Sequence, residues 1–195
     1  GLVRVIRCHV SEGYNKNFVG RAFGYLSFMI SCLYAGLFRA KDRYDAVLVT
    51  SPPLFIGLSG VLIAKRKKVP LVFEIRDLWP ESAIDSGILT NNFLISLAYW
   101  AEKYIYKKAT IISVLTPAFR DQLVDYKNIE SEKIIYVPNA CDFSLSDKIL
   151  ANYTKAELKK QMGWEGKKVF TYVGAHGIAN HLSQVLDAME QVKDE

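Results

Sequence analysis

Apolar residues in this chain form short runs that alternate with longer segments of helical periodicity. The short runs are rich in Val and Ile and are mostly apolar throughout, as in strands buried on both faces of a parallel sheet. These strand-like runs are 3–10, 45–50, 70–75, 109–115, 133–138 and 168–173. The pattern predicts repeated β-α-β units in an α/β fold, with an open, doubly wound parallel sheet of the Rossmann-like type.

Helical segments are expected between these strands. They lie near 19–40, 54–67, 91–108, 117–126, 154–162 and 180–193. A polar, turn-rich stretch at 139–165 interrupts the alternation, and its short helix begins with a capping-box pattern at Thr154 and Glu157. We therefore expect a first domain over 1–138, a linker over 139–165 and the start of a second domain over 166–195.

Composition narrows the possible functions only slightly. Half of the 195 residues are hydrophobic and the formal net charge is +5. Such a chain folds as a globular protein and can favour an anionic partner such as a phosphate, a nucleotide or an acidic lipid surface, but it is not basic enough to indicate nucleic acid. Cys8, Cys32 and Cys141 lack the spacing of a zinc site or a disulfide framework, which favours a reducing, cytoplasmic setting.

One long uncharged stretch, Ala22–Phe38, has three possible interpretations. Its 17 residues are fewer than the about 20 that a bilayer span needs, so a helix packed within the protein is favoured. An interfacial membrane contact and a transmembrane span remain alternatives. The bases that follow at Arg39, Lys41 and 65–68 are explained by helix dipoles or, alternatively, by contact with acidic lipid.

Polar residues gather in the loops that follow the predicted strands. In a parallel sheet these loops converge at one edge, where ligands bind. The candidate site residues there are Ser51, Arg76, Asp77, Trp79, Glu81, Asn139, Asp142, Gly174, His176 and Gly177. The stretch 172–180 reads as a strand, a glycine-bounded turn and a helix, which suits a phosphate or simply a tight turn.

The carboxylates of the third loop also allow two interpretations. Asp77 and Glu81 could act as a base toward a hydroxyl group. Alternatively, Glu81 lies in the first turn of a short helix, and Arg76 neutralises one of the two carboxylates in an ion pair. His176 could be a phosphate ligand or a turn residue bonded to backbone.

Four segments resemble a known family when they are taken together. "SPPLFIGLSG", "FEIRDLWPES", "KIIYVPNACD" and "YVGAHGIANHL" occur in this order, as in glycosyltransferase family 4 within the two-domain GT-B fold. The resemblance is closest to the bacterial O-antigen and capsule branch, which includes N-acetyl-L-fucosamine transferases. It implies that 1–138 is most of the acceptor-binding domain without its first βα unit, and that 166–195 begins the nucleotide-sugar domain.

The resemblance also implies a reaction. A sugar, for example from UDP-N-acetyl-L-fucosamine, would pass from a nucleoside diphosphate to a lipid-linked acceptor with retention of configuration and without a metal or other cofactor. The implied catalytic residues are Arg76 and Asp77, the substrate-binding residues are Ser51, Trp79, Glu81, Asn139 and Asp142, and the diphosphate-binding residues are Gly174, His176 and Gly177. Two family glutamates and a donor-phosphate Arg/Lys pair are expected beyond Glu195. Residues 1–195 alone are expected to be inactive, because half of the cleft would be missing.

This branch departs from the wider family at two positions. Many relatives have histidine at about the position of Arg76, and the usual glycine of the PNGVD turn is Ala140 here. The alternative functions are a non-catalytic nucleotide-binding or scaffolding partner, and a Rossmann dehydrogenase or epimerase, which the missing GxGxxG pattern disfavours. The expected location is cytoplasmic, with peripheral contact at the inner face of the membrane.

Overall fold

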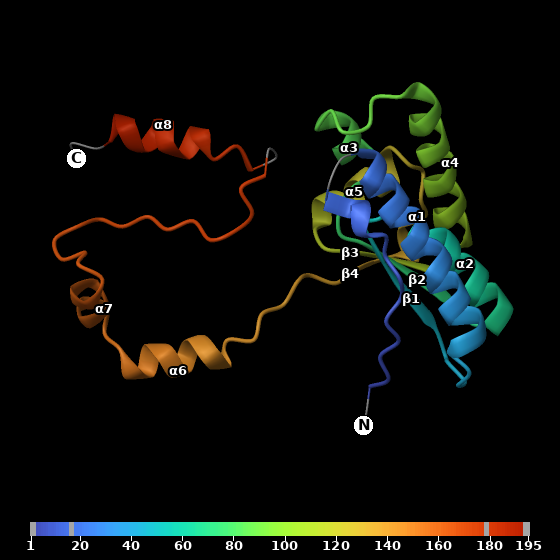
Figure 1. Ribbon diagram of the computed structural model, residues 1–195, viewed down its shortest axis with the longest axis horizontal. Coiled ribbons are helices and arrows are strands. Elements are labelled where there is room, and N and C mark those ends of the chain that lie inside the picture. Colours follow the sequence, from blue (N-terminus) through green and yellow to red (C-terminus); the bar gives the residue numbers. More distant parts are fainter. Residues whose placement is uncertain (1–2, 16–17, 178–179, 193–195) are drawn as a thin grey trace. The chain divides into compact units, whose positions relative to one another are not determined.

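The computed structural model describes residues 3–15, 18–177 and 180–192, and the chain divides into two compact units (Figure 1). Unit 1 is Gly1–Pro138 and unit 2 is Asn139–Glu195. All four strands that the described residues form belong to unit 1. The linker and second-domain assignments for 139–165 and 166–195 stay predictions.

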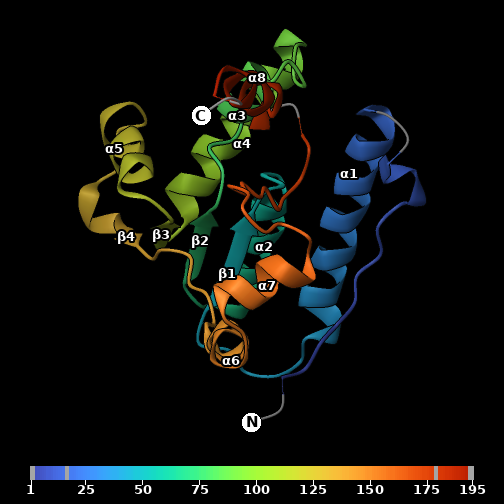
Figure 2. The same ribbon diagram turned by 90° about the vertical axis from the view of Figure 1, so that its left-hand side faces the viewer.

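The core of unit 1 is a parallel sheet whose strands pair in chain order (Figure 2). The strands are β1 (Val47–Ser51), β2 (Leu71–Ile75), β3 (Ile111–Val114) and β4 (Ile134–Tyr136). Each coincides with a predicted run to within a few residues at its ends. Parallel neighbours need long crossover connections, and helices supply them here, which confirms the predicted Rossmann-like α/β class.

Helices flank this sheet, and side chains define where two of them begin. The helical elements of unit 1 are η1 (Glu12–Asn15), α1 (Phe18–Tyr34), the π-helix η2 (Ala35–Arg39), α2 (Ile56–Lys67), α3 (Glu81–Asp85), α4 (Asn92–Lys108), α5 (Pro117–Asp125) and η3 (Ser131–Lys133). The Asn91 side chain accepts hydrogen bonds from the first amides of α4, and Thr116 does the same for α5. Both are N-cap residues of the preferred type.

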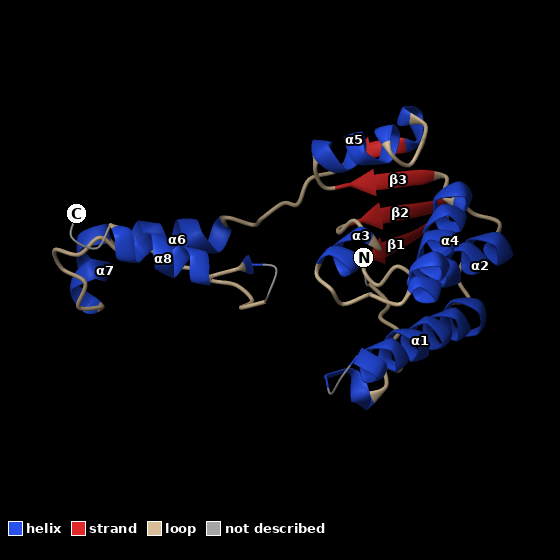
Figure 3. Ribbon diagram, turned by 90° about the horizontal axis from the view of Figure 1, so that it is seen from above, coloured by secondary structure: helices blue, strands red, loops and turns tan. Residues whose placement is uncertain are grey.

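Helices bury one face of the sheet (Figure 3). The residues of one cross-strand row on this face are Val49, Phe73, Ile112 and Ile134. Phe73 and Ile112 are fully buried, and Ile105 of α4 and Leu123 of α5 belong to the same cluster. Gly60 lets α2 approach β1, because a Cβ atom there would lie 2.4 Å from Val49 Cγ2.

The opposite face of the sheet is more open. Burial alternates along β1 and β2. On the open face, Leu48 of β1 is exposed, and Val72 and Glu74 of β2 are half-buried. Thr50 Oγ1 donates a hydrogen bond to Glu74 Oε2 across this face, at 2.6 Å. The described residues therefore cover one face of the sheet more completely than the other.

Segment 3–10 is not a strand, so this prediction is wrong within the described residues. At the C-terminal end of the segment, two backbone groups are bonded to hydroxyl groups of α1. The amide of Ser11 donates to Ser27 Oγ at 2.9 Å, and Ser31 Oγ donates to the carbonyl of His9 at 2.8 Å. These bonds hold the end of the segment against α1.

The favoured prediction of a buried helix at Ala22–Phe38 is also wrong. Among the described residues, Ala22–Arg39 is the one helical window long and apolar enough to cross a membrane, and 11% of it is buried. One face of α1 packs on α2, where Ser59 Oγ donates to the Met29 carbonyl at 2.8 Å. The outward face stays apolar and exposed.

Unit 2 contains α6 (Ser144–Asn152), α7 (Lys155–Gln161) and α8 (Ser183–Gln191). The predicted capping box of α7 is confirmed, because Thr154 Oγ1 accepts from the Glu157 amide and the Glu157 carboxylate accepts from the Thr154 amide. The helix α6 was not predicted. The predicted strand 168–173 is absent, since no described residue of unit 2 forms a strand with which it could pair.

Candidate functional site

Two of the predicted loops meet at the carboxyl edge of the sheet. The amide of Arg76 donates to the carbonyl of Ser51 at 3.1 Å, which continues the ladder between β1 and β2 by one bond. Ser51 itself is buried. The loop that begins at Ser51 and the loop that begins at Arg76 therefore leave the sheet side by side, as the topology of parallel strands predicts.

An aromatic contact joins the same two loops a few residues further on. The ring of Trp79 lies edge-to-face against Phe55, with centroids 6.5 Å apart and planes at 73°. Trp79 is half-buried and also packs against the core cluster of unit 1. This arrangement of the rings stabilises both loops and keeps part of the indole accessible.

The loop around Asp77 is stabilised by local hydrogen bonds. Ser82 Oγ donates to Asp77 Oδ2 at 2.9 Å, and the Trp79 amide donates to the Asp77 carbonyl at 3.0 Å. Because a carboxylate can accept several hydrogen bonds, the bond from Ser82 orients Asp77 and leaves further acceptor capacity. Such a carboxylate can accept a proton or hold a substrate hydroxyl group.

Arg76 lies at the exposed start of this loop. Within residues 3–15, 18–177 and 180–192, no acidic group forms an ion pair with its guanidinium, so the predicted pairing with Asp77 or Glu81 is not seen there. An exposed arginine next to an oriented carboxylate suits contact with an anionic group of a substrate.

Glu81 forms an ion pair with Lys127, which follows α5 in the chain. Lys127 Nζ also contacts Glu102 Oε2 of α4 at 2.9 Å and lies 4.9 Å from the ring centroid of Tyr99. Lys127 thus bridges α3 and α4. We refer to Glu81, Tyr99, Glu102 and Lys127 as the lysine-bridged cluster.

Burial and charge act in opposite directions within the lysine-bridged cluster. Burial would lower the pKa of Lys127, but hydrogen bonds from Lys127 to Glu81 and Glu102 outweigh it and raise that pKa. Burial raises the pKa of Glu102, and Lys127 partly counters this increase. Glu81 Oε2 is buried without a hydrogen-bond partner among the described residues. The cluster therefore depends on one cation that serves two carboxylates.

Sequence reasoning placed Glu81 in the site but missed Lys127 and Glu102. A signal for Glu102 was available, because it falls on the apolar face of its helix with Ala98, Ala101 and Ile105 at helical spacing. A charge on such a face requires a partner. No local pattern identified Lys127 as that partner, because 25 residues separate it from Glu102.

Asn139 and Asp142 are both exposed in unit 2. Asp142 Oδ1 accepts a hydrogen bond from the amide of Ser144 at 2.9 Å. Hydrogen bonds from Ser144 lower the pKa of Asp142. Among the contacts described, Asp142 thus stabilises the first turn of α6, and its substrate-binding role stays a prediction.

The predicted diphosphate turn is exposed at Gly174, His176 and Gly177. Tyr172 Oη donates a hydrogen bond to the Ala175 carbonyl at 3.0 Å. A Cβ atom at residue 174 would lie 2.7 Å from Tyr172 Oη, so the turn has no room for a side chain there. The next helix, α8, begins at Ser183 rather than directly after the turn. Residues 178–179 lie outside the described chain, and diphosphate binding stays a prediction.

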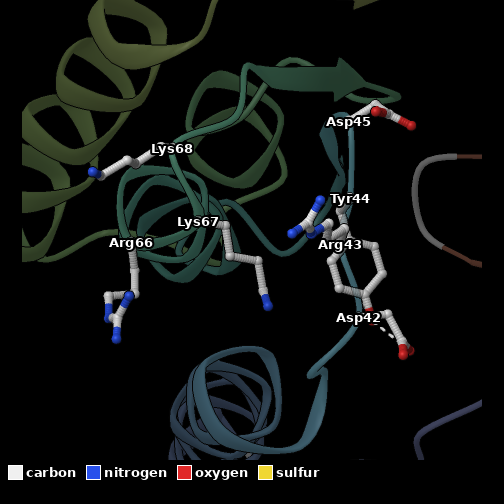
Figure 4. A pocket seen from close by; sticks show the side chains of 7 residues that line it. All are labelled: Asp42, Arg43, Tyr44, Asp45, Arg66, Lys67 and Lys68. Carbon is white, nitrogen blue, oxygen red and sulfur yellow. Dashed lines mark hydrogen bonds between the residues drawn. The ribbon is translucent and has the colours of Figure 1, made fainter.

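No group of three or more His, Cys, Asp or Glu side chains in the described residues could hold a metal ion. A hollow of about 540 Å³ lies away from the loops of the candidate site, against the C-terminal end of α2. It is lined by Asp42, Arg43, Tyr44, Asp45, Arg66, Lys67 and Lys68 (Figure 4). The loops of unit 1 in the predicted site and this basic hollow are therefore separate features.

Comparison with known proteins gives two matches. The family model described as "Glycosyl transferase 4-like domain" matches residues 1–140. A curated protein of Escherichia coli (strain K12), "Putative colanic acid biosynthesis glycosyl transferase WcaI", is 21% identical over 199 aligned residues. The alignment covers 100% of this chain and 48% of that protein, so the chain spans about half the length of its relative.

Proposed function

Because the chain belongs to the glycosyl transferase 4-like family, we propose that the whole protein transfers a sugar from a nucleoside diphosphate to a lipid-linked acceptor in polysaccharide biosynthesis. The observation that carries this proposal is the family match over residues 1–140, which includes the two loops joined at Ser51 and Arg76. The colanic acid description of the relative favours a polysaccharide product. The proposed donor is UDP-N-acetyl-L-fucosamine or a similar nucleotide sugar.

The proposed reaction retains the anomeric configuration and needs no metal ion. Cleavage of a glycosyl–phosphate bond leaves negative charge on the departing diphosphate and positive charge on the sugar ring. Arg76 is exposed, and Ser82 donates a hydrogen bond to Asp77. The proposed roles are contact with a substrate anion for Arg76, and contact with a hydroxyl group or a developing positive charge for Asp77. In unit 2, we propose that the amides of the 174–177 turn contact the diphosphate.

The expected setting is the cytoplasmic face of the membrane, since a lipid-linked acceptor is held there and the nucleotide sugar is soluble. Peripheral contact with that surface forms part of the proposal. The observation in its favour is the exposed apolar face of α1.

The direct test is a screen of nucleotide sugars with the full-length protein and a lipid-diphosphate sugar acceptor, with product detection by mass spectrometry. Asp77→Asn should lower kcat by about 100-fold, because the amide can still accept from Ser82 but can neither take a proton nor carry charge. Its thermal midpoint should change little. Asp85→Asn in α3 removes the same charge from an exposed position and should leave kcat unchanged.

Two outcomes would contradict the proposal. Normal turnover of the Asp77→Asn variant would reduce Asp77 to a structural residue. Nucleotide binding by the full-length protein without transfer from any donor would favour the second candidate, a non-catalytic partner that has retained the fold.

A further inference from the structure

Segment 3–11 lies along α1 in the opposite chain direction. Near its C-terminal end, Ser31 Oγ donates to the carbonyl of His9 at 2.8 Å, and the amide of Ser11 donates to Ser27 Oγ at 2.9 Å. As the segment advances by two residues, its partner in α1 moves back by four. Four helical residues rise about 6 Å and two extended residues span about 7 Å, so the two chains keep step. The two bonds therefore define an antiparallel register between an extended segment and the helix.

A third contact extends this register toward the N-terminus. Arg4 Nη2 donates to the carbonyl of Arg39 at 3.4 Å, at the end of η2. Residue 8 stands between residue 4, which contacts 39, and residue 9, which contacts 31. Interpolation along the register therefore places Cys8 beside Cys32 and its neighbours in α1.

The side chain of Cys8 is turned toward α1. Ile6 and Cys8 are half-buried. Arg7 and His9, the residues that follow each of them, are exposed. Side chains alternate between two sides of an extended segment, so the half-buried pair shares the side that faces the helix. Cys32 is also half-buried, and both thiols are free.

The two thiols also influence each other. Burial raises the pKa of the Cys32 thiol to about 12, and Cys8 raises it further in the same direction, through a side-chain hydrogen bond and through its charge. Only a sulfur atom close by can act on Cys32 in this way. The fold thus brings together two of the three cysteines of the chain, although they are 24 positions apart in the sequence.

We propose that Cys8 and Cys32 are an oxidation site, at which a peroxide forms a reversible disulfide between segment 3–11 and α1. The thiolate of one cysteine attacks the peroxide, and this step gives a sulfenic acid and one water. The second sulfur then attacks the sulfenic sulfur, forms the S–S bond and releases another water. The two thiols lose two electrons and two protons in total, which reduce one hydrogen peroxide to two waters.

The two cysteines have different roles in this sequence of steps. The raised pKa of Cys32 keeps its thiol protonated, and the thiolate is the nucleophile, so Cys8 is the sulfur that attacks the peroxide. Oxidation of Cys8 removes its negative charge, which is one of the influences that raise the pKa of Cys32. Cys32 is therefore better able to attack in the second step.

The disulfide closes a loop of 25 residues, from 8 to 32. Closure of such a loop restricts the unfolded chain and stabilises the contact between the segment and α1. A disulfide that forms only on oxidation is the kind found in a reducing compartment. Its formation needs neither a donor nor an acceptor sugar, so its test can fail while sugar transfer succeeds, or succeed while transfer fails.

The test is treatment of the full-length protein with a small excess of hydrogen peroxide, alkylation of the remaining thiols and tryptic peptide mapping by mass spectrometry. Trypsin isolates the two cysteines in peptides 8–16 and 22–39, because Lys or Arg bounds each of them. We expect these two peptides to be linked, with a mass two hydrogen atoms below their sum, and dithiothreitol should separate them. In untreated protein both peptides should carry the alkyl label.

Single variants separate the pair from general oxidation. Cys8→Ser and Cys32→Ser should each abolish the linked peptide. In Cys32→Ser the sulfenic acid on Cys8 has no partner, so dimedone should trap it. Cys141→Ser removes the exposed third thiol and is the matched control, in which the linkage should form normally. Peroxide should raise the thermal midpoint of this control and of the unmodified sequence by about 3 °C, and should not raise that of Cys8→Ser.

Two results would overturn the proposal. Oxidation of both cysteines to sulfinic acids without a linked peptide would show that their sulfur atoms do not meet. Linkage of either cysteine to Cys141 or to a second chain, in preference to the bond between 8 and 32, would show that exposure rather than the register of segment 3–11 decides the pairing.

Discussion

Two short segments of similar sequence have different structures in this chain. Val72-Phe73-Glu74-Ile75 forms most of β2, whereas Val169-Phe170-Thr171-Tyr172 forms no strand. Phe73 is fully buried, and Phe170 is 73% exposed. Both segments have β-branched and aromatic residues, so their intrinsic preferences are alike.

The difference lies in their neighbours. β2 has parallel partners on both sides, β1 and β3, and helices cover one of its faces. In unit 2, no described residue is buried and no described segment forms a strand. A strand is therefore stabilised by pairing and burial, and intrinsic preference alone is insufficient.

The largest expected effect on stability is at Phe73, and Phe170 is its exposed counterpart. Phe73→Ala should lower the free energy of unfolding of unit 1 by about 3–5 kcal/mol, since it leaves a cavity in the sheet. Phe170→Ala should change it by less than about 0.5 kcal/mol. Urea unfolding followed by circular dichroism measures both, and equal effects would contradict the comparison.

A smaller effect is expected at the cluster that supports the loop after β2. Lys127→Met should lower the free energy of unfolding by about 2–3 kcal/mol, because it leaves Glu81 and Glu102 without their cation. Lys103→Met, at an exposed position of α4, is the control and should have little effect. Loss of stability in both variants alike would argue against a specific role of Lys127.

The same variant should also change the pH dependence of stability. Burial already raises the pKa of Glu102, and removal of Lys127 removes an influence that lowers it. A carboxyl group whose folded pKa lies above its unfolded value loses stabilisation as pH rises through that interval. The loss in free energy of unfolding caused by Lys127→Met should therefore be larger at about pH 8 than at about pH 5. Equal deficits at both pH values would show that Glu102 does not titrate in this way.

The smallest effect is expected in unit 2, where stability is local. Thr154→Ala removes the N-cap of α7 and should destabilise that helix by about 1 kcal/mol, without any effect on unit 1. Amide hydrogen exchange resolved by residue would show faster exchange in α7 alone. Thr171→Ala, in the segment without strand structure, is the control; a matching change there would mean that unit 2 folds more cooperatively than its contacts indicate.

Sequence reasoning succeeded where the pattern is local and repeated. The helix 91–108 and the capping box at Thr154 depend on residues a few positions apart. The meeting of the loops after Ser51 and Ile75 also followed from sequence, because parallel strands direct their loops to one edge. The prediction of a strand at 3–10 failed; the described segment forms no strand, and at its end His9 and Ser11 bond to hydroxyl groups of α1 through their backbone.

The sequence by itself determined the α/β class, four strands, the family and the loops after the strands that contain the candidate site residues. These features could be predicted because hydrophobic periodicity and the order of motifs are properties of the linear sequence. Only the tertiary structure decided that Lys127 serves both Glu81 and Glu102, that α1 presents an apolar stripe outward and that bases distant in sequence surround the end of that stripe. These features depend on which surfaces pack together, and packing brings together residues whose separation along the chain carries no signal.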